Sequence, residues 1–447
     1  MSDTTLKAFR ATLVDFNDLA HSSEQIAEQF RYIPDGLLVV ENGKIRDLLA
    51  WSPQAEQQLG CEILDLRGKI IMPGMIDTHI HYPQTEMIAA FGEQLLEWLE
   101  QYTFPTESKY GDEAYARQMA TFFIRQLFSH GTTTALVFGS VHPESVEALF
   151  SEAEKYAMRL IAGKVMMDRN VPAELEETVQ QSVQQTEALI ERWHGKGRLG
   201  YAITPRFVPT SSPQLLEKAG ELRQRYPDVW MQTHLSENQK EIAWVKELYP
   251  QQESYLAVYD HYRLTGKRSV FAHCIHLEEK EWQCLHNTGS SVSFCPSSNL
   301  FLGSGLFNLS AAKSHRIPVG MGTDVGAGTS FSLLRTLGDG YKVQQLQNYK
   351  LNACEAFYHA TLGGAHALDL HSVIGNFATG KEADFIVIDP AVTPLQALRH
   401  HNSKDIFGQL FVLMTLGDER NIAQTWVNGE CVWQQAMTEE VHHAVFA

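Results

Sequence analysis

The sequence predicts an α/β fold, a (β/α)8 barrel of the TIM type with a small flanking β-sandwich domain built from both termini. Eight short apolar, β-favouring runs recur between residues 75 and 324, and helical patterns lie between most of them. Alternating strands and helices are typical of βαβ units and a parallel sheet. Eight such units within about 250 residues suit a closed barrel better than an open sheet.

The predicted barrel strands follow one another along the middle of the chain. They are MIDTHIH (75–81), TALVFGS (134–140), RLIAGKVMMD (159–168), RLGYAITPRF (198–207), WMQTHLSE (230–237), SVFAHCIH (269–276), SSVSFCPSSN (290–299) and IPVGMGTD (317–324). The runs between them, such as EAYARQMATFFIRQLFSHG and SPQLLEKAGELRQRYP, have the period expected of helices that cover a barrel.

The two ends of the chain have a different pattern. Residues 35–70 and 380–433 contain short strand-like runs with turn signals such as Asn428-Gly429. One β segment before the barrel and one after it are expected to pair into a single small domain. We therefore predict that residues 1–70 and 373–447 form the two parts of the β-sandwich domain and residues 71–372 form the catalytic barrel.

Composition excludes several classes of function. The 447 residues are 44% hydrophobic and 20% charged, as in ordinary globular proteins. The net charge is −17 and no basic run stands out, so we expect no nucleic-acid partner. No apolar run approaches the length of a membrane span and no signal peptide is evident. Six scattered cysteines without a CxxC pair fit reduced thiols, so we expect a cytoplasmic protein without a membrane partner.

The first predicted strand ends in an unusual pair of histidines. Side chains alternate faces along a strand, so Asp77, His79 and His81 project from one face of MIDTHIH. Imidazole nitrogens that converge on one point are preferred ligands of divalent transition metals. Taken alone, the motif also fits two histidines packed on a half-buried sheet.

Other polar residues occur at the ends of later strands, where barrel enzymes place their catalytic groups. The fifth run ends with His234 and Glu237, the sixth contains His273, and the eighth closes with Asp324. Each has a structural explanation on its own, because a lone histidine is often a core residue and an aspartate often caps a helix. Their recurrence in four βα units favours one shared site.

The pattern predicts a site for one metal ion. His79, His81 and His234 would supply nitrogen ligands and Asp324 an oxygen ligand, with water completing the shell. Such an ion converts its bound water to hydroxide near neutral pH. Glu237 lies three residues beyond His234, where it can move protons without binding the metal.

Alternative chemistries find less support in the sequence. A two-metal site would need a carboxylated lysine on the fourth strand, which has none, and Lys164 on the third strand is expected to be structural. The GxSxG and GK(S/T) motifs are absent, as is the H-x-E and P-C-x-x-C pair of zinc deaminases.

These motifs resemble those of the amidohydrolase superfamily. PGMIDTHIH, HGTTT, the later GTD and IGNFATGKEADFIVID are similar to the superfamily pattern. DTHIHYPQ, TPRF, QTHLSEN, FAHCIHL, CPSSNLFLGSG and GTDVGAGTSFS are similar to its guanine deaminases in particular. The resemblance extends from about residue 35 to about residue 433 and implies a (β/α)8 barrel with a flanking β-domain.

The resemblance also implies roles for individual residues. The metal ligands fall on His79, His81, His234 and Asp324, the catalytic groups on Glu237, His273 and Asp324, and the substrate-binding residues on Gln84, Arg206, Phe207, Glu237 and His273. The implied cofactor is one zinc ion per chain, and the implied partners are a small purine substrate and a second copy of the chain in a homodimer.

The implied reaction is the hydrolysis of guanine to xanthine and ammonia, a step of purine catabolism. Hydroxide attacks C2, Asp324 accepts the proton of the water, and Glu237 protonates the neighbouring ring nitrogen and later helps the amine to leave. His273 would orient the water or stabilise developing charge.

Two alternatives remain at this stage. A related deaminase for 8-oxoguanine, an adenosine-type nucleoside or a triazine would keep every metal residue, so only Gln84, Arg206 and Phe207 argue against it. A catalytically inactive barrel protein would have lost ligands, whereas every metal and proton-transfer position is present here.

Overall fold

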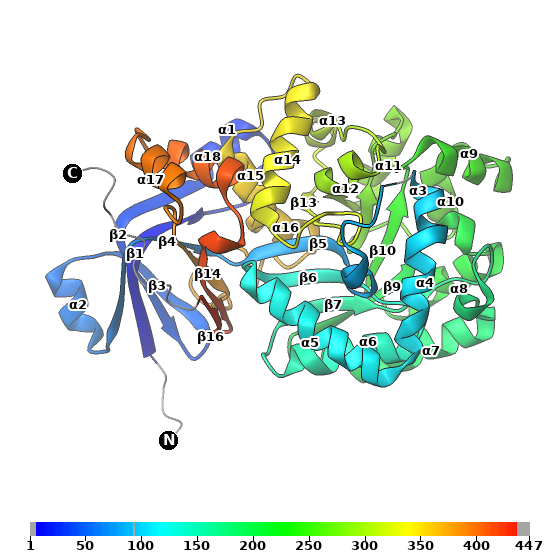
Figure 1. Cartoon of the computed structure of the whole chain (residues 1–447), viewed down its shortest axis with the longest axis horizontal. Helices are drawn as coiled ribbons and strands as arrows, with labels where there is room; N and C mark the ends of the chain where they lie inside the picture. The colour runs from blue at the N-terminus through cyan, green and yellow to red at the C-terminus, as the bar shows by residue number, and fades with distance from the viewer. Residues whose placement is uncertain (1–5, 93, 436–447) are drawn as a thin grey trace.

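A computed structural model describes residues 6–92 and 94–435, and the outermost parts of the predicted terminal segments lie outside the described residues. The chain forms a barrel and a separate seven-stranded sheet that lie side by side (Figure 1). The first connection between them is sharp, because sheet strand β4 (Ile63–Pro73) is separated only by Gly74 from the first barrel strand, which begins at Met75. A side chain at Gly74 would meet Thr133 Oγ1 at 2.0 Å, so only glycine fits there.

The barrel consists of parallel strands in chain order. They are β5 (Met75–His81), β6 (Thr132–Phe138), β7 (Arg159–Gly163), β9 (Leu199–Pro205), β10 (Trp230–Leu235), β11 (Ser269–His273), β12 (Ser291–Phe294) and β13 (Val319–Met321). Strand β13 pairs with β5, which closes the barrel. The two-residue β8 (Val165–Met166) follows β7 and continues its pairing along β9. The predicted (β/α)8 barrel is therefore confirmed.

Helices cover the outside of the barrel, as amphipathic segments between parallel strands require. The longest are α5 (Glu113–Ser129), α6 (Pro143–Glu154), α7 (Val179–Trp193), α8 (Pro213–Arg225) and α14 (Leu333–Leu346). Several begin at sequence-encoded caps. The Asp112 side chain accepts hydrogen bonds from the first turn of α5, and Ser212 caps α8 ahead of a proline at the first helical position.

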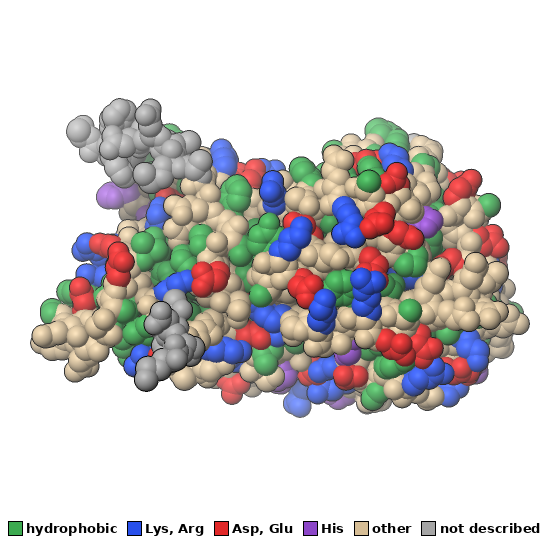
Figure 2. All heavy atoms as spheres, turned by 90° about the horizontal axis from the view of Figure 1, so that it is seen from below, with side chains coloured by type: hydrophobic (Ala, Val, Ile, Leu, Met, Phe, Trp, Pro, Cys, Tyr) green, Lys and Arg blue, Asp and Glu red, His purple; other side chains and the backbone are tan. Residues whose placement is uncertain are grey.

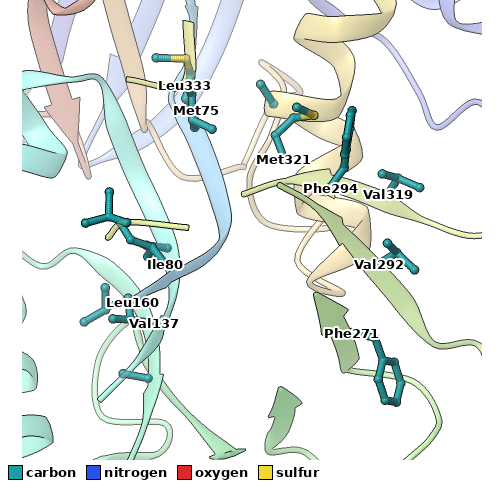
Figure 3. Close-up of a cluster of buried hydrophobic side chains, with 14 of the residues drawn as sticks. Met75, Ile80, Val137, Leu160, Phe271, Val292, Phe294, Val319, Met321 and Leu333 are labelled. Atoms are coloured by element: carbon teal, nitrogen blue, oxygen red, sulfur yellow. The ribbon is translucent and has the colours of Figure 1, made fainter. Parts of the chain in front are cut away.

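The barrel strands are buried on both faces, which is why they read as apolar runs. Figure 3 shows this core, in which Ile80, Val137 and Leu160 come from neighbouring strands on one side of the barrel. Phe271 and Val292 come from strands on the other side. The packed core fixes the strand ends, and so the polar side chains that follow them, in space.

The terminal segments meet in one sheet with the strand order β16-β15-β14-β4-β1-β2-β3. The N-terminal side supplies β1 (Leu6–Phe16), β2 (Phe30–Glu41), β3 (Lys44–Ala50) and β4 (Ile63–Pro73), and the C-terminal side supplies β14 (Phe385–Ile388), β15 (Ile422–Val427) and β16 (Glu430–Gln434). Strands β4 and β14 pair antiparallel, which joins the two ends of the chain. Phe9, Phe385 and Trp426 pack together in the core of this sheet.

Two further helices, α17 (Pro394–His401) and α18 (Ile406–Leu416), lie between β14 and β15. Within the described part of the chain, no helix has both the length and the apolar character needed to cross a bilayer. Figure 2 shows acidic and basic side chains interspersed over the face seen from below, rather than gathered by sign.

Candidate active site

Three histidines meet at the C-terminal edge of the barrel. His79 and His81 are at the end of β5 and His234 is near the end of β10, and their ligand atoms all lie within 4.8 Å of one another. His81 Nε2 is 3.1 Å from His234 Nε2. Strand alternation thus brings the predicted imidazoles to one point.

Asp324 joins this cluster from the loop after β13, the strand that pairs with β5. It follows β13, and its Oδ1 lies 3.2 Å from His79 Nε2 and 3.4 Å from His81 Nε2. The Asp324 amide donates to the carbonyl oxygen of His79 at 2.9 Å, which ties the two strand ends together. The residue has a φ of +51°, a left-handed conformation that turns the chain sharply after the strand.

The protonation states of the cluster suit a cation. Burial lowers the pKa of His79 and His234, and it lowers the pKa of His81 to about 3. Burial raises the pKa of Asp324, but its close contacts with His79 and His81 lower it well below its usual value. Three neutral imidazoles and one carboxylate are therefore available, and metal ligands must be deprotonated in this way.

Hydrogen bonding also favours a metal at this point. His79 Nε2 is buried and has no hydrogen-bond partner among the described residues. His234 Nδ1 is 2.7 Å from the carbonyl oxygen of Arg206. Because a carbonyl oxygen can only accept, this contact assigns the proton to Nδ1 and leaves a lone pair on Nε2. The donor set fits a divalent transition ion, and these residues could hold one.

Glu237 and His273 lie next to the cluster. His273 Nε2 is 3.4 Å from Glu237 Oε2 and 3.7 Å from Asp324 Oδ2. Ser304 donates to Glu237 Oε1 at 3.0 Å, and Asn299 Oδ1 lies 2.8 Å from His273 Nδ1. Burial, reinforced by the charge of Asp324, raises the pKa of Glu237 to about 8, so this carboxyl can hold a proton near neutral pH.

Asp77, the third residue on this face of β5, has a different environment. Its carboxylate accepts hydrogen bonds from the Thr323 hydroxyl at 2.5 Å and from the Thr323 amide at 3.1 Å. Burial raises its pKa to about 7. Asp77 therefore buttresses the strand end that precedes Asp324.

A cavity opens beside the cluster. Gln84, Arg206 and Phe207 line it, together with Glu237 and His273. An apolar wall consists of Leu95, Trp98, Leu99, Leu302 and Ala327. A cavity with one apolar wall and a few convergent polar groups is typical of a small-molecule site.

Lys164 lies apart from this cavity, outside its described lining. Its fully buried ammonium group pairs with Glu177 at 2.5 Å, which accounts for its place in the fold.

Sequence reasoning missed several residues that contact the site. Glu107, Asn299 and Ser304 hold Arg206, His273 and Glu237 through side-chain hydrogen bonds. None of them ends a barrel strand, so the strand-end argument could not find them. In the sequence these residues stand in FPTE and CPSSNLFLGSG, where a polar residue is ordinary for a loop or a short helix and gives no signal of a site.

Comparison with known proteins gives a consistent answer. Residues 70–432 match the Amidohydrolase family. Over 432 residues the chain is 57% identical to the guanine deaminase of Escherichia coli (strain K12), covering 96% of this chain and 98% of that protein. It is 35% identical over 388 residues to the guanine deaminase of Homo sapiens, covering 83% of this chain and 85% of that protein.

Solved structures agree. The E. coli guanine deaminase is similar to the whole chain with a TM-score of 0.94 at 56% identity, covering 96% of this chain and 100% of that one. The guanine deaminase from C. acetobutylicum, solved with bound guanine in the active site, has a TM-score of 0.87 at 32% identity, covering 96% and 100%. An atrazine chlorohydrolase from Arthrobacter aurescens TC1 has a TM-score of 0.81 at 20% identity, covering 96% and 95%, which shows only a shared fold.

Proposed function

This chain belongs to the amidohydrolase family and is one of its guanine deaminases, and on that premise we propose how its residues divide the hydrolysis of guanine to xanthine and ammonia. The observation that supports the assignment most directly is the meeting of three imidazoles and a carboxylate beside a cavity that could accept a planar base. A triazine or nucleoside substrate is disfavoured, because the relatives with high identity are guanine deaminases.

The metal ligands in this proposal are His79, His81, His234 and Asp324. A divalent ion bound there, for which we propose zinc in one copy per chain, would supply Lewis acidity that makes water nucleophilic at neutral pH. The hydrogen bond from His234 to the Arg206 carbonyl would hold that imidazole in the ligating tautomer.

Proton transfer falls to the carboxyl groups. Asp324 accepts the proton of the water that attacks C2, because it is the ionised carboxylate at the cluster. Glu237 protonates the ring nitrogen beside C2, which makes C2 more electrophilic. The proton held by Asp324 then passes to the leaving amine with the help of Glu237, which recovers its own proton from the C2 hydroxyl as the carbonyl of xanthine forms. His273 lies between the two carboxyl groups and would orient the water or stabilise developing charge.

Recognition of the base falls to Gln84, Arg206 and Phe207. The Arg206 guanidinium has only donors, so it suits the O6 acceptor of guanine and opposes the 6-amine of adenine. Gln84 has both a donor and an acceptor for another polar edge, and Phe207 offers a flat apolar face. Sites that hydrogen-bond their substrate reject analogues strongly, because their buried donors are left unpaired.

Metal analysis tests the ligand assignment. We expect about one transition-metal equivalent per chain in the purified protein and loss of that metal in a His79→Ala/His81→Ala double variant. Two equivalents per chain, or retention of metal by the double variant, would contradict the proposed site.

Substrate profiling tests the recognition residues. We expect Arg206→Ala to reduce turnover of guanine severely while metal content and fold persist, and we expect the wild type to leave adenine unreacted. A harmless Arg206→Ala substitution or efficient adenine deamination would reject this assignment.

The homodimer and the place in purine catabolism remain predictions from the family resemblance, and the cytoplasmic location remains a prediction from the scattered cysteines. Light scattering at low micromolar concentration, with a mass of twice the 50.4 kDa chain as the expected result, tests the first of them.

A further inference from the structure

We propose that Glu107 is a positioning residue that determines which atoms of Arg206 and Gln84 face the purine. The inference rests on the substrate-binding roles proposed above for these two side chains. Glu107 ends the short helix α4 (Phe104–Glu107), and its side chain is completely buried. Among the described residues lining the cavity are Arg206 and Gln84 but not Glu107, so Glu107 would act through its neighbours.

Glu107 holds the guanidinium of Arg206 by one nitrogen. Arg206 Nη1 donates to Glu107 Oε1 at 3.0 Å and to Oε2 at 2.8 Å. The Phe104 ring adds a second contact, with its centroid 5.7 Å from Arg206 Cζ. Within the described chain, the other two nitrogens of the Arg206 guanidinium, Nε and Nη2, have no hydrogen-bond partner. They therefore remain available as donors to a ligand in the cavity that Arg206 lines.

The same carboxylate sets the orientation of the Gln84 amide. Gln84 Nε2 donates to Glu107 Oε1 at 3.1 Å, and Gln84 Oε1 accepts from the Gly326 amide at 3.2 Å. A reversed amide would place its oxygen against the carboxylate and its NH₂ group against an N–H, and both arrangements are repulsive. Glu107 and Gly326 together therefore leave one defined donor and one defined lone pair of Gln84 for the substrate.

The charge of Glu107 has a further consequence. Arg206 is buried, and its positive charge acts on all three histidines of the cluster. A buried cation without a partner is strongly unfavourable, and removing one member of a buried pair costs more than the pair contributes. Glu107 thus allows a guanidinium to stay in the cavity wall beside a proposed cation site.

The test compares guanine with 2-aminopurine, which has the same C2 amine but lacks O6. 2-Aminopurine also lacks the proton on N1, so the ratio of kcat/KM for the two substrates measures recognition of the edge of guanine that carries O6. One hydrogen bond from a charged donor to O6 changes this ratio by about tenfold to a hundredfold. We expect Glu107→Gln to lower this ratio by about that factor, mainly through guanine, and Glu107→Asp to retain part of it. In a Glu107→Gln/Arg206→Ala variant the ratio should equal that of Arg206→Ala alone.

Glu177→Gln is the matched control, because Glu177 is a largely buried carboxylate paired with Lys164 away from the cavity. It should leave the ratio unchanged even if it lowers stability. A Glu107→Gln enzyme whose two kcat/KM values fall equally would overturn the proposal, provided that Arg206→Ala lowers the ratio. If Arg206→Ala leaves the ratio unchanged, the substrate role of Arg206 fails first and the positioning role of Glu107 fails with it.

Discussion

At the scale of single residues, burial decides the protonation states of His79, His81, His234 and Glu237. Burial lowers the pKa of His81 to about 3 and raises that of Glu237 to about 8. The two changes have one cause, since a low-dielectric environment disfavours whichever form is charged. Neutral imidazoles and a protonated carboxyl therefore coexist at neutral pH within one small site.

Glu237→Gln tests proton transfer most directly. The substitution keeps the shape of the side chain and its contact with Ser304 but removes the titratable group. We expect turnover of guanine to fall by about two to four orders of magnitude, while the metal content stays that of the wild type. Loss of metal from the variant would make Glu237 a ligand, and near-normal turnover would reject its role as an acid.

Much of the site could be predicted at this scale because strand geometry is local. Alternation along MIDTHIH placed His79 and His81 on one face, and the strand-end argument added His234 and Asp324. Alternation also placed Asp77 on that face. Only the tertiary structure shows that the Asp77 carboxylate accepts a hydrogen bond from the Thr323 hydroxyl. Glu107 could not be found, because its role depends on partners that are distant in the sequence.

At the scale of elements, the predicted barrel strands begin within two residues of the observed ones, because each is an apolar run, but all except the first extend two to five residues beyond the observed ends. The irregular pieces could not be predicted. Residues 95–107 form α3 (Leu95–Trp98), a short π-helix (Leu99–Thr103) and α4. The first two of these supply Leu95, Trp98 and Leu99 to the cavity wall. Strand β1 was not among the predicted strands, although FRATL within it alternates apolar and polar residues.

The helices behind the barrel give a prediction about pH. The Glu355 carboxylate in α15 (Ala353–Ala360) accepts from Ser23 at 2.9 Å and from Tyr349 at 2.7 Å, and it pairs with Lys313. Burial raises the pKa of Glu355, but the interactions with His359 and Lys313 outweigh burial and lower this pKa from 4.5 to about 2. A carboxyl group whose pKa is lower in the folded than in the unfolded protein stabilises the fold at any pH above its unfolded-state pKa. This contribution is lost as the pH falls toward the folded-state pKa.

We therefore expect Glu355→Gln to lower the free energy of unfolding by about 3 kcal/mol at pH 7. The difference from the wild type should stay constant down to about pH 4.5 and shrink as the pH falls toward 2, because glutamine mimics the protonated acid. Urea denaturation of both proteins at pH 7, 5, 4 and 3, without metal, measures this difference. A difference that is independent of pH would show that Glu355 is not ionised against Lys313.

At the scale of the whole molecule, the barrel and the terminal sheet are joined at the face opposite the active site. Arg159 and Arg198 precede or begin barrel strands, and both reach carboxylates beside β14. Arg159 donates to Glu382 at 2.8 and 2.6 Å, and Arg198 donates to Glu382 at 2.9 Å and also pairs with Asp384. In a barrel enzyme this N-terminal face serves stability, which separates the joint from the chemistry.

Arg198→Met tests that separation. All four groups of the joint are largely buried, so removing one guanidinium leaves two carboxylates with too few partners, and we expect a loss of about 3–5 kcal/mol in the free energy of unfolding. Arg117→Met is the control, because its pair with Glu113 is exposed on α5 and is worth less than about 1 kcal/mol. Neither substitution should change kcat/KM for guanine measured well below the unfolding temperature. Two outcomes would contradict the purely structural role that the position of this joint at the N-terminal face implies. One is that Arg198→Met destabilises the protein no more than Arg117→Met. The other is that Arg198→Met lowers the activity of the fully folded enzyme.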